Sequence, residues 1–164
     1  MNLSRKTLGF DFPLTLELKP PKKGLYRCRV VYEDIILSME YIPYIQKDIK
    51  SFKLIHSSID YPLKYENRDE INRLFEKKET SDEIIIVKDG LITDTSIANI
   101  CLYDGKHWLT PRTPLLKGTT RQRLLDNNQI VLADIKYQDI HKFTKIALLN
   151  AMIDFHIIEN AIIT

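Results

Sequence analysis

The segment Leu115-Leu116-Lys117-Gly118-Thr119-Thr120-Arg121 has residue types that suit the binding of an anion. Glycine lets a backbone approach a ligand closely, and Gly118 stands where a helix is predicted to begin. The first N–H groups of a helix have no partner within it, so those of Thr119 and Thr120 would attract a phosphate or carboxylate. The alternative is an ordinary capped helix start, because threonine is a common cap. The segment is not a Walker loop, since no second glycine precedes Lys117 at the needed distance.

Lys64 stands in an apolar and aromatic stretch, after Tyr61-Pro62-Leu63 and before Tyr65. A lysine removed from water has a lowered pKa and can attack carbonyl groups as a nucleophile. The alternative for Lys64 is an ordinary solvated lysine at the surface.

Asp94 lies in the stretch Gly90–Ser96, where a turn leads into a strand. An acid at such a place is commonly a turn or cap residue. The alternative with a function is a carboxylate held against a cationic ring nitrogen. Arg27 and Arg29 share one face of a predicted strand and could bind a substrate carboxylate, or they are charges on an exposed face.

Several classes of function find no support in the sequence. The four histidines have no metal-ligand spacing, and no Gly-x-Ser-x-Gly motif of a serine hydrolase is present, so we predict no metal site. A formal charge of +2 on 164 residues argues against nucleic acid or a membrane surface as the partner, and no apolar run approaches the length of a membrane span. Without an apolar signal segment, and with Cys28 and Cys101 far apart, we expect free thiols and a cytoplasmic location.

The elements that must position these residues follow from patterning. Alternation or apolar runs between turn residues predict strands, and spacing of three and four residues predicts helices. The predicted strands are Leu25–Tyr32, Ile35–Tyr41, Phe52–Ser57, Glu83–Val87, Ile97–Tyr103, Lys106–Leu109, Ile130–Ile135 and Lys145–Leu149. The pair Asp89-Gly90 predicts a turn after the strand Glu83–Val87. The predicted helices are Glu66–Lys78, Thr119–Asp126 and a short one within residues 1–9. The mixture predicts an α/β to α+β fold with a boundary near residue 45.

Taken in order, these pieces resemble the class IV aminotransferase family of pyridoxal-phosphate enzymes, which includes branched-chain and D-amino-acid aminotransferases and aminodeoxychorismate lyase. The matching text is Lys64-Tyr65 before a helix, then DEIIIVKDGLITDTSIANICLYDGKHWLTP, then PLLKGTTRQRLL. The positions on the family pattern are Asn99, Thr110, Pro111, Gly118, Thr120 and Arg121. The resemblance implies a two-domain fold, with a truncated N-terminal α/β subdomain over residues 1–45 and a C-terminal pseudo-barrel domain over residues 46–164 that binds the cofactor.

The resemblance also implies roles for single residues. Lys64 would be the catalytic residue, which holds pyridoxal 5'-phosphate as a Schiff base and moves the proton at the substrate Cα. Asp94 falls where the family usually has a glutamate that keeps the pyridine nitrogen protonated, and its side chain is one carbon shorter. Arg29 falls near a family arginine that faces the substrate. The residues expected around the cofactor and its phosphate, besides Lys64 and Asp94, are Gly118, Thr119, Thr120, Asn150 and Ala151.

Three functions stay open at this point. The resemblance implies either a 4-amino-4-deoxychorismate lyase, which eliminates pyruvate to give 4-aminobenzoate for folate synthesis, or an amino-acid aminotransferase. The text Asn150-Ala151-Met152 favours the lyase. The start Met1-Asn2-Leu3-Ser4-Arg5 resembles a family helix that lies tens of residues into other members, so the third possibility is a catalytically impaired or non-catalytic relative. We expect a small-molecule amino substrate and a homodimer.

Overall fold

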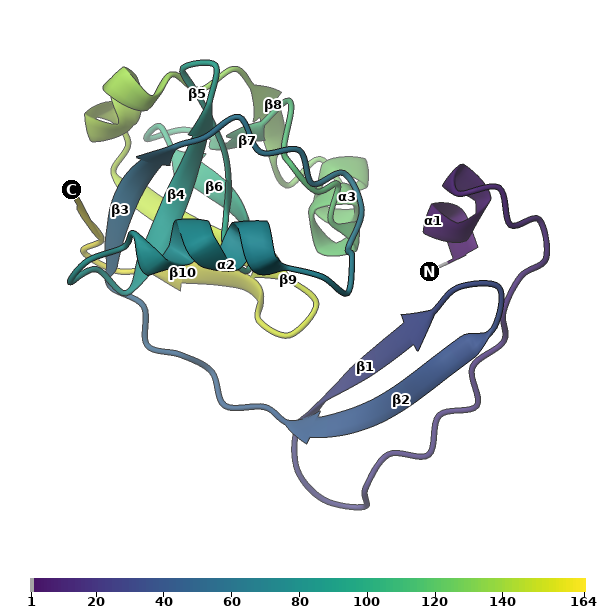
Figure 1. Cartoon of the computed structure of the whole chain (residues 1–164). Coiled ribbons are helices and arrows are strands. Elements are labelled where there is room, and N and C mark those ends of the chain that lie inside the picture. Colours follow the sequence, from purple (N-terminus) through teal and green to yellow (C-terminus); the bar gives the residue numbers. More distant parts are fainter. Residues whose placement is uncertain (1) are drawn as a thin grey trace. The chain divides into compact units, whose positions relative to one another are not determined.

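A computed structural model describes the backbone of residues 2–164 and the side chains of residues 4–164. The chain divides into two compact units, Met1–Lys47 and Asp48–Thr164, each described here by itself (Figure 1). Met1, with which the N-terminal helix motif begins, lies outside the described residues.

The first unit consists of one short helix and one hairpin. Helix α1 (Asn2–Thr7) is followed by Gly9 at a positive φ of 86°, a conformation that glycine adopts without strain. Strands β1 (Tyr26–Tyr32) and β2 (Ile36–Pro43) pair antiparallel, as the alternating sequence predicts. Strand β2 continues past its predicted end at Tyr41 to Pro43, because a proline at a strand end forfeits no interior ladder bond. The buried Arg5 donates to the backbone oxygen of Glu33 at 2.8 Å, which attaches the helix to the hairpin turn.

The second unit is a large mixed sheet with few helices. Its strand order is β10-β9-β6-β5-β4-β3-β11, with β7 beside β6 and β8 beside β7. The strands are β3 (Ser51–His56), β4 (Glu83–Lys88), β5 (Leu91–Thr95), β6 (Asn99–Tyr103), β7 (Trp108–Pro111), β8 (Val131–Ala133), β9 (Lys145–Asn150), β10 (Asp154–Ile158) and β11 (Ile162–Ile163). The helices are α2 (Asp69–Glu76), α3 (Thr119–Asp126) and the 3-10 helix η1 (Tyr137–Lys142).

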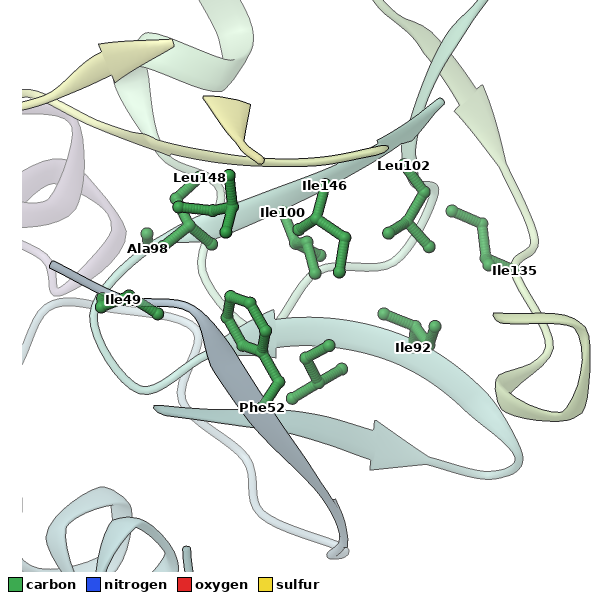
Figure 2. Packing of buried hydrophobic residues seen from close by; sticks show 11 residues of the cluster. Ile49, Phe52, Ile92, Ala98, Ile100, Leu102, Ile135, Ile146 and Leu148 are labelled. Carbon is green, nitrogen blue, oxygen red and sulfur yellow. The ribbon is translucent and has the colours of Figure 1, made fainter. Parts of the chain in front are cut away.

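Strand β4 is apolar on both faces because both faces are covered. Ile85 points into the main core, which Figure 2 shows around Phe52, Ile100 and Leu148. Its neighbours Ile84 and Ile86 belong to a second cluster with residues of α2, which lies across the sheet in Figure 1. A run of consecutive apolar residues is what a strand buried on both faces requires.

The β4–β5 hairpin has the predicted turn at Asp89-Gly90. Lys88 pairs with Leu91, and both turn residues have positive φ, 51° and 78°, as a two-residue hairpin turn of type I′ requires. The sheet then returns on itself, because Ile92 N–H donates to the oxygen of Ile135 at 2.8 Å, beyond β8. The circuit from β5 through β6, β7 and β8 back to β5 confirms the predicted class: a mixed α/β fold built on a curled sheet.

Several predicted boundaries are wrong, and strand β5 was not predicted. Helix α2 begins at Asp69 and not at Glu66, and the strand expected from Ile97 begins at Asn99. Strand β5 precedes it over Leu91–Thr95, a stretch expected mainly as a turn. Three buried polar side chains break the apolar pattern of β5, and they are accommodated by hydrogen bonds such as Thr93 Oγ1 to Ile86 O at 2.9 Å.

Candidate functional site

The start of helix α3 lies directly against strand β6. Gly118 is the N-cap, with an extended backbone (φ −69°, ψ 144°), and α3 runs over Thr119–Asp126 as predicted. A Cβ at Gly118 would lie 2.1 Å from Oδ1 of Asn99, so no other residue fits here without displacing that side chain. Thr120 is buried and Thr119 is exposed. The structure thus places the predicted anion site, with the first N–H groups of α3, beside the beginning of β6.

Asp94 is buried in the same place, on β5. Its Oδ1 accepts a hydrogen bond from Nδ2 of Asn99 at 2.6 Å, and its Oδ2 accepts one from the Leu116 N–H at 2.9 Å. Burial raises the pKa of Asp94 to about 7, against the lowering effects of those two donors and of the positive charge of Arg121. The carboxylate therefore joins the segment before α3 to the sheet, and each of its oxygens already has one protein donor.

Arg121 of α3 is a buried structural residue. Its Nε donates to Thr110 Oγ1 at 3.1 Å, and its Nη2 donates to the oxygen of Pro111 at 2.6 Å. Thr110 in turn donates to the oxygen of Ile100 at 3.0 Å. Burial lowers the pKa of Arg121, while the nearby carboxyl of Asp94 opposes that change. These hydrogen bonds attach α3 to the β6–β7 hairpin.

The end of β9 completes this group of segments. Asn150 Oδ1 accepts from Met152 N–H at 2.8 Å, and its Nδ2 donates to the oxygen of Ile97 at 3.3 Å. Leu149 pairs with Asn99, so Asn150 and the exposed Ala151 follow a residue that lies opposite the start of β6. The structure brings together six of the predicted cofactor residues on adjoining segments, namely Asp94, Gly118, Thr119, Thr120, Asn150 and Ala151.

Lys64 lies in the loop between β3 and α2, and it is exposed. Its apolar sequence neighbours do not remove it from water, because Tyr61 turns inward to the core instead of covering it. Lys64 is nevertheless held at the centre of a γ-turn, in which Tyr65 N–H donates to the oxygen of Leu63 at 3.0 Å. The Tyr61 hydroxyl donates to the oxygen of Tyr65 at 3.0 Å, and the two rings meet edge to face. The loop therefore presents Lys64 on a braced turn.

An apolar cluster and a hydrogen bond connect this loop to the segments around Asp94. Leu115, which precedes α3, packs against the cluster that includes Ile59 and Tyr61 of the loop. At the other end of the loop, Arg68 Nη2 donates to the oxygen of Ser96, two residues after Asp94, at 2.7 Å. The loop that carries Lys64 thus packs beside the segment before α3 and is bonded to the β5–β6 turn.

Sequence reasoning missed Glu83, Ser96 and Arg68 as parts of this region. Glu83 is 1% exposed, and its carboxylate accepts hydrogen bonds from Ser96 N–H at 3.2 Å and from Ser96 Oγ at 2.9 Å. A signal was present in the sequence, since a glutamate at the head of the apolar run EIIIV is out of place unless it has buried partners.

The remaining predictions concern sites elsewhere. Arg29 lies on β1 of the first unit, where its Nη1 is 3.9 Å from Oε1 of Glu40, so its role toward a substrate stays a prediction. Over residues 4–164, no group of histidine, cysteine, aspartate or glutamate side chains could hold a metal ion. Within the described part of the chain, no helix is long and apolar enough to cross a membrane.

Comparison with known proteins agrees with the resemblance seen in the sequence. A protein of Haemophilus influenzae, itself uncharacterized, is 41% identical over 134 residues, which cover 81% of this chain and 71% of that protein. A solved structure from Haemophilus somnus 129PT, of a protein proposed to be a 4-amino-4-deoxychorismate lyase, is 35% identical, with a TM-score of 0.75. That match covers 92% of this chain and 74% of the other.

A third comparison shows the fold alone. A structure from Mesorhizobium loti, of a protein proposed to be an amino-acid aminotransferase, is 19% identical and has a TM-score of 0.75. The match covers 85% of this chain and 73% of the other.

The family described as "Amino-transferase class IV" matches residues 41–160, which include every segment of the group around Asp94 and the loop of Lys64. The chain belongs to the class IV amino-transferase family.

Proposed function

We propose that this chain is a pyridoxal-phosphate-dependent enzyme with Lys64 as its catalytic lysine. The observation that carries the proposal is that Asn99 contacts both the start of α3, which suits an anion, and the buried carboxylate of Asp94. The N–H groups of Thr119 and Thr120 begin α3, Asp94 lies on β5, and Asn99 contacts both places. A ligand with a phosphate at one end and a cationic ring nitrogen at the other would satisfy both.

The residues present fit this cofactor. Gly118 lets the start of α3 approach β6 closely, because a Cβ there would lie 2.1 Å from Oδ1 of Asn99, and the first N–H groups of α3 have no partner within the helix. Asp94 accepts hydrogen bonds from Nδ2 of Asn99 and from backbone N–H groups just before α3, and a carboxylate has about four lone-pair sites to share among its donors. A cation beside Asp94 would lower its pKa from about 7 and favour the charged carboxylate. When bound, the cofactor would supply a ring that withdraws electrons from the substrate Cα.

The protein residues would then have distinct tasks. Thr119 and Thr120 bind and orient the phosphate, and Asp94 retains the proton on the ring nitrogen. Lys64 would hold the cofactor through its amine and would move the proton at the substrate Cα. Tyr61 and the γ-turn around Lys64 keep the backbone of that residue in one place, which limits the positions its amine can reach.

Within the family, we propose a lyase of the 4-amino-4-deoxychorismate type, which releases pyruvate and leaves 4-aminobenzoate, a folate precursor. The support is the 35% identity over 92% of the chain to the Haemophilus somnus protein that is proposed to have this activity. The alternative is an amino-acid aminotransferase, which would need the same lysine and would differ in where that lysine returns the proton.

The first experiment is chemical trapping. Purified protein is incubated with pyridoxal phosphate, reduced with borohydride, digested and examined by mass spectrometry for the pyridoxyl group. We expect the label on Lys64, its loss in Lys64→Arg, and its retention in Lys106→Arg, which changes an exposed lysine in the β6–β7 turn. Labels scattered over surface lysines would contradict the assignment and favour a non-catalytic relative.

The second experiment separates the two reactions by their products. Formation of 4-aminobenzoate and pyruvate from 4-amino-4-deoxychorismate supports the lyase. Formation of a keto acid with transfer of the amino group to an acceptor supports the aminotransferase. Labelling at Lys64 without either product would show a cofactor site that has no turnover with these substrates.

We further propose a homodimer and a cytoplasmic location, both by analogy with the family. The described cysteines, Cys28 and Cys101, are free thiols, as a reducing compartment permits. Sedimentation velocity at several protein concentrations tests the dimer, and a monomer throughout would remove that part of the proposal.

A further inference from the structure

We propose that Arg68 is a positioning residue, which holds the loop of Lys64 against the β5–β6 turn beside Asp94. The inference rests on the proposed function for its catalytic meaning, and on contacts within the second unit for its structural part. Arg68 lies four residues after Lys64 and immediately before α2.

The contact that carries the inference crosses from the loop to the sheet. Arg68 Nη2 donates to the backbone oxygen of Ser96 at 2.7 Å, and 28 residues separate the two in sequence. A hydrogen bond from a charged guanidinium is stronger than one between neutral groups. Nε of Arg68 is buried and has no hydrogen-bond partner within the described part of the chain. Burying this N–H group without a partner costs free energy, and the hydrogen bond to Ser96 offsets part of that cost.

The anchor that Arg68 reaches is itself rigid. Ser96 donates through both its N–H and its hydroxyl to Glu83, which is 1% exposed at the head of β4. Glu83 also accepts from the Ile84 N–H at 2.8 Å. Buried polar networks in which the members satisfy one another restrict a structure to one arrangement. The loop is thus attached to a fixed point two residues beyond Asp94.

The first half of the loop is held by other contacts, while Arg68 holds the second half at the sheet. Ser57 N–H donates to the oxygen of Val87 at 2.9 Å, which fixes the first residue of the loop to β4. Tyr61 and the γ-turn brace Lys64 locally, through hydrogen bonds from the Tyr61 hydroxyl to Tyr65 and from the Tyr65 N–H to Leu63. A pocket of about 670 Å³ lies along this half of the loop, with Tyr61, Tyr65 and Arg68 in its wall. Releasing Arg68 would let this wall, and the turn of Lys64 with it, move relative to Asp94.

The test compares three variants. Arg68→Gln removes the charge and the reach, and Arg68→Lys retains the charge without the planar fork of donors. Arg73→Gln is the control, because Arg73 is an exposed residue of α2 that borders the same pocket. Pyridoxyl labelling of Lys64 is measured beside the affinity for pyridoxine phosphate, which has the phosphate and the ring nitrogen but no carbonyl, and so reports on the α3 site and Asp94 without the amine of Lys64.

We expect Arg68→Gln to slow labelling of Lys64 about tenfold, the usual cost of one charged hydrogen bond. Arg68→Lys is expected to show an intermediate effect and Arg73→Gln none, and pyridoxine phosphate should bind all of them as it binds the wild type. Labelling of Arg68→Gln at the wild-type rate overturns the proposal. A parallel loss of pyridoxine phosphate binding and of the melting temperature also overturns it, because that pattern indicates a general structural role.

Hydrogen exchange tests the tether without the cofactor. In Arg68→Gln the Tyr65 amide should exchange faster, while the amides of β9 keep their wild-type rates. Unchanged exchange at Tyr65 overturns the tether. If the wild-type protein is not labelled at Lys64, the proposed function fails, and this exchange measurement still decides whether Arg68 holds the loop.

Discussion

Nδ2 of Asn99 lies 2.6 Å from Oδ1 of Asp94 and donates a hydrogen bond to it, and the same nitrogen also donates to the oxygen of Leu116 at 2.7 Å. One side chain thereby joins β5, β6 and the segment before α3. Its Oδ1 faces Gly118 on the other side. The place where a phosphate would bind and the place where a ring nitrogen would meet a carboxylate are connected by this single amide.

The free energy of unfolding of the wild type should fall as pH rises, and the substitution Asp94→Asn should remove this fall. Burial raises the pKa of Asp94 from 3.8 to about 7, so the folded chain binds this proton more tightly than the unfolded chain does. The stabilisation by the protonated form is fully present below the unfolded pKa and is lost as pH rises through the folded pKa. Between about pH 4 and pH 7 the free energy of unfolding of the wild type should therefore fall by roughly a few kcal/mol relative to that of Asp94→Asn.

Urea unfolding at both pH values, without ligand, measures this difference. Asp104→Asn is the matched control: the His107 and Lys106 N–H groups lower the pKa of Asp104, so its titration lies below that range. Equal pH dependence in wild type and Asp94→Asn would contradict the prediction.

Gly118→Ala should destabilise the chain by about 1–3 kcal/mol, the usual cost of forcing an extra methyl group into a packed site. The added Cβ would lie 2.1 Å from Asn99 Oδ1, and Asn99 cannot turn away without losing its bonds to Asp94 and Leu116. The same substitution in an Asn99→Ala background should cost much less, because the obstructing oxygen is gone. Additive effects in this double-mutant cycle, measured by urea unfolding, would show that the two residues do not interact.

Thr119→Pro should weaken the binding of pyridoxine phosphate about tenfold, as expected for the loss of one N–H that bonds to a charged group. The helix should tolerate the change, because proline is favoured at the first helical position and Gly118 already has the extended backbone that a following proline requires. Calorimetric titration measures the affinity. Thr119→Ala, which retains the N–H and removes only the hydroxyl, separates the two contributions, and equal binding by Thr119→Pro and wild type would exclude this N–H from the site.

Ser96→Ala should destabilise the chain by about 1.5–3 kcal/mol, since it removes a hydroxyl that donates to a buried carboxylate. The hydroxyl lies 2.9 Å from Oε2 of Glu83. Ser58→Ala is the control, because Ser58 is exposed and substitutions at such positions usually change stability by less than about 0.5 kcal/mol. Thermal unfolding of both variants compares them, and a loss no greater than that of Ser58→Ala would contradict a structural role for the Ser96 hydroxyl.

Local features of this chain were predictable because they depend on neighbouring residues. The helix over Thr119–Asp126, the turn at Asp89-Gly90 and the buried strand of EIIIV all occur where patterning predicts them. The helix follows from the residues at its start, the turn from two residues that tolerate positive φ, and the strand from a run of apolar residues. A few consecutive residues are enough to show each of these.

Elements that depend on distant partners were not predicted. Strands β10 and β11 and the 3-10 helix η1 have weak local patterns. Strand β11, over Ile162–Ile163, pairs in parallel with β3, more than a hundred positions earlier in the chain. Such pairings are stabilised only after the sheet has formed, so a local pattern does not contain them.

The same division holds in the candidate site. Residue types and order identified Lys64, Asp94 and the start of α3 as chemically capable, because nucleophilicity, acidity and unpaired N–H groups belong to single residues or to one helix end. Their environments depended on packing. Asp94 is buried because Asn99 and Leu116 close over it, while Lys64 is exposed although its sequence neighbours are apolar. Burial and hydrogen bonding to residues far away in sequence are properties of the folded chain, and they decide which of its reactive groups meet.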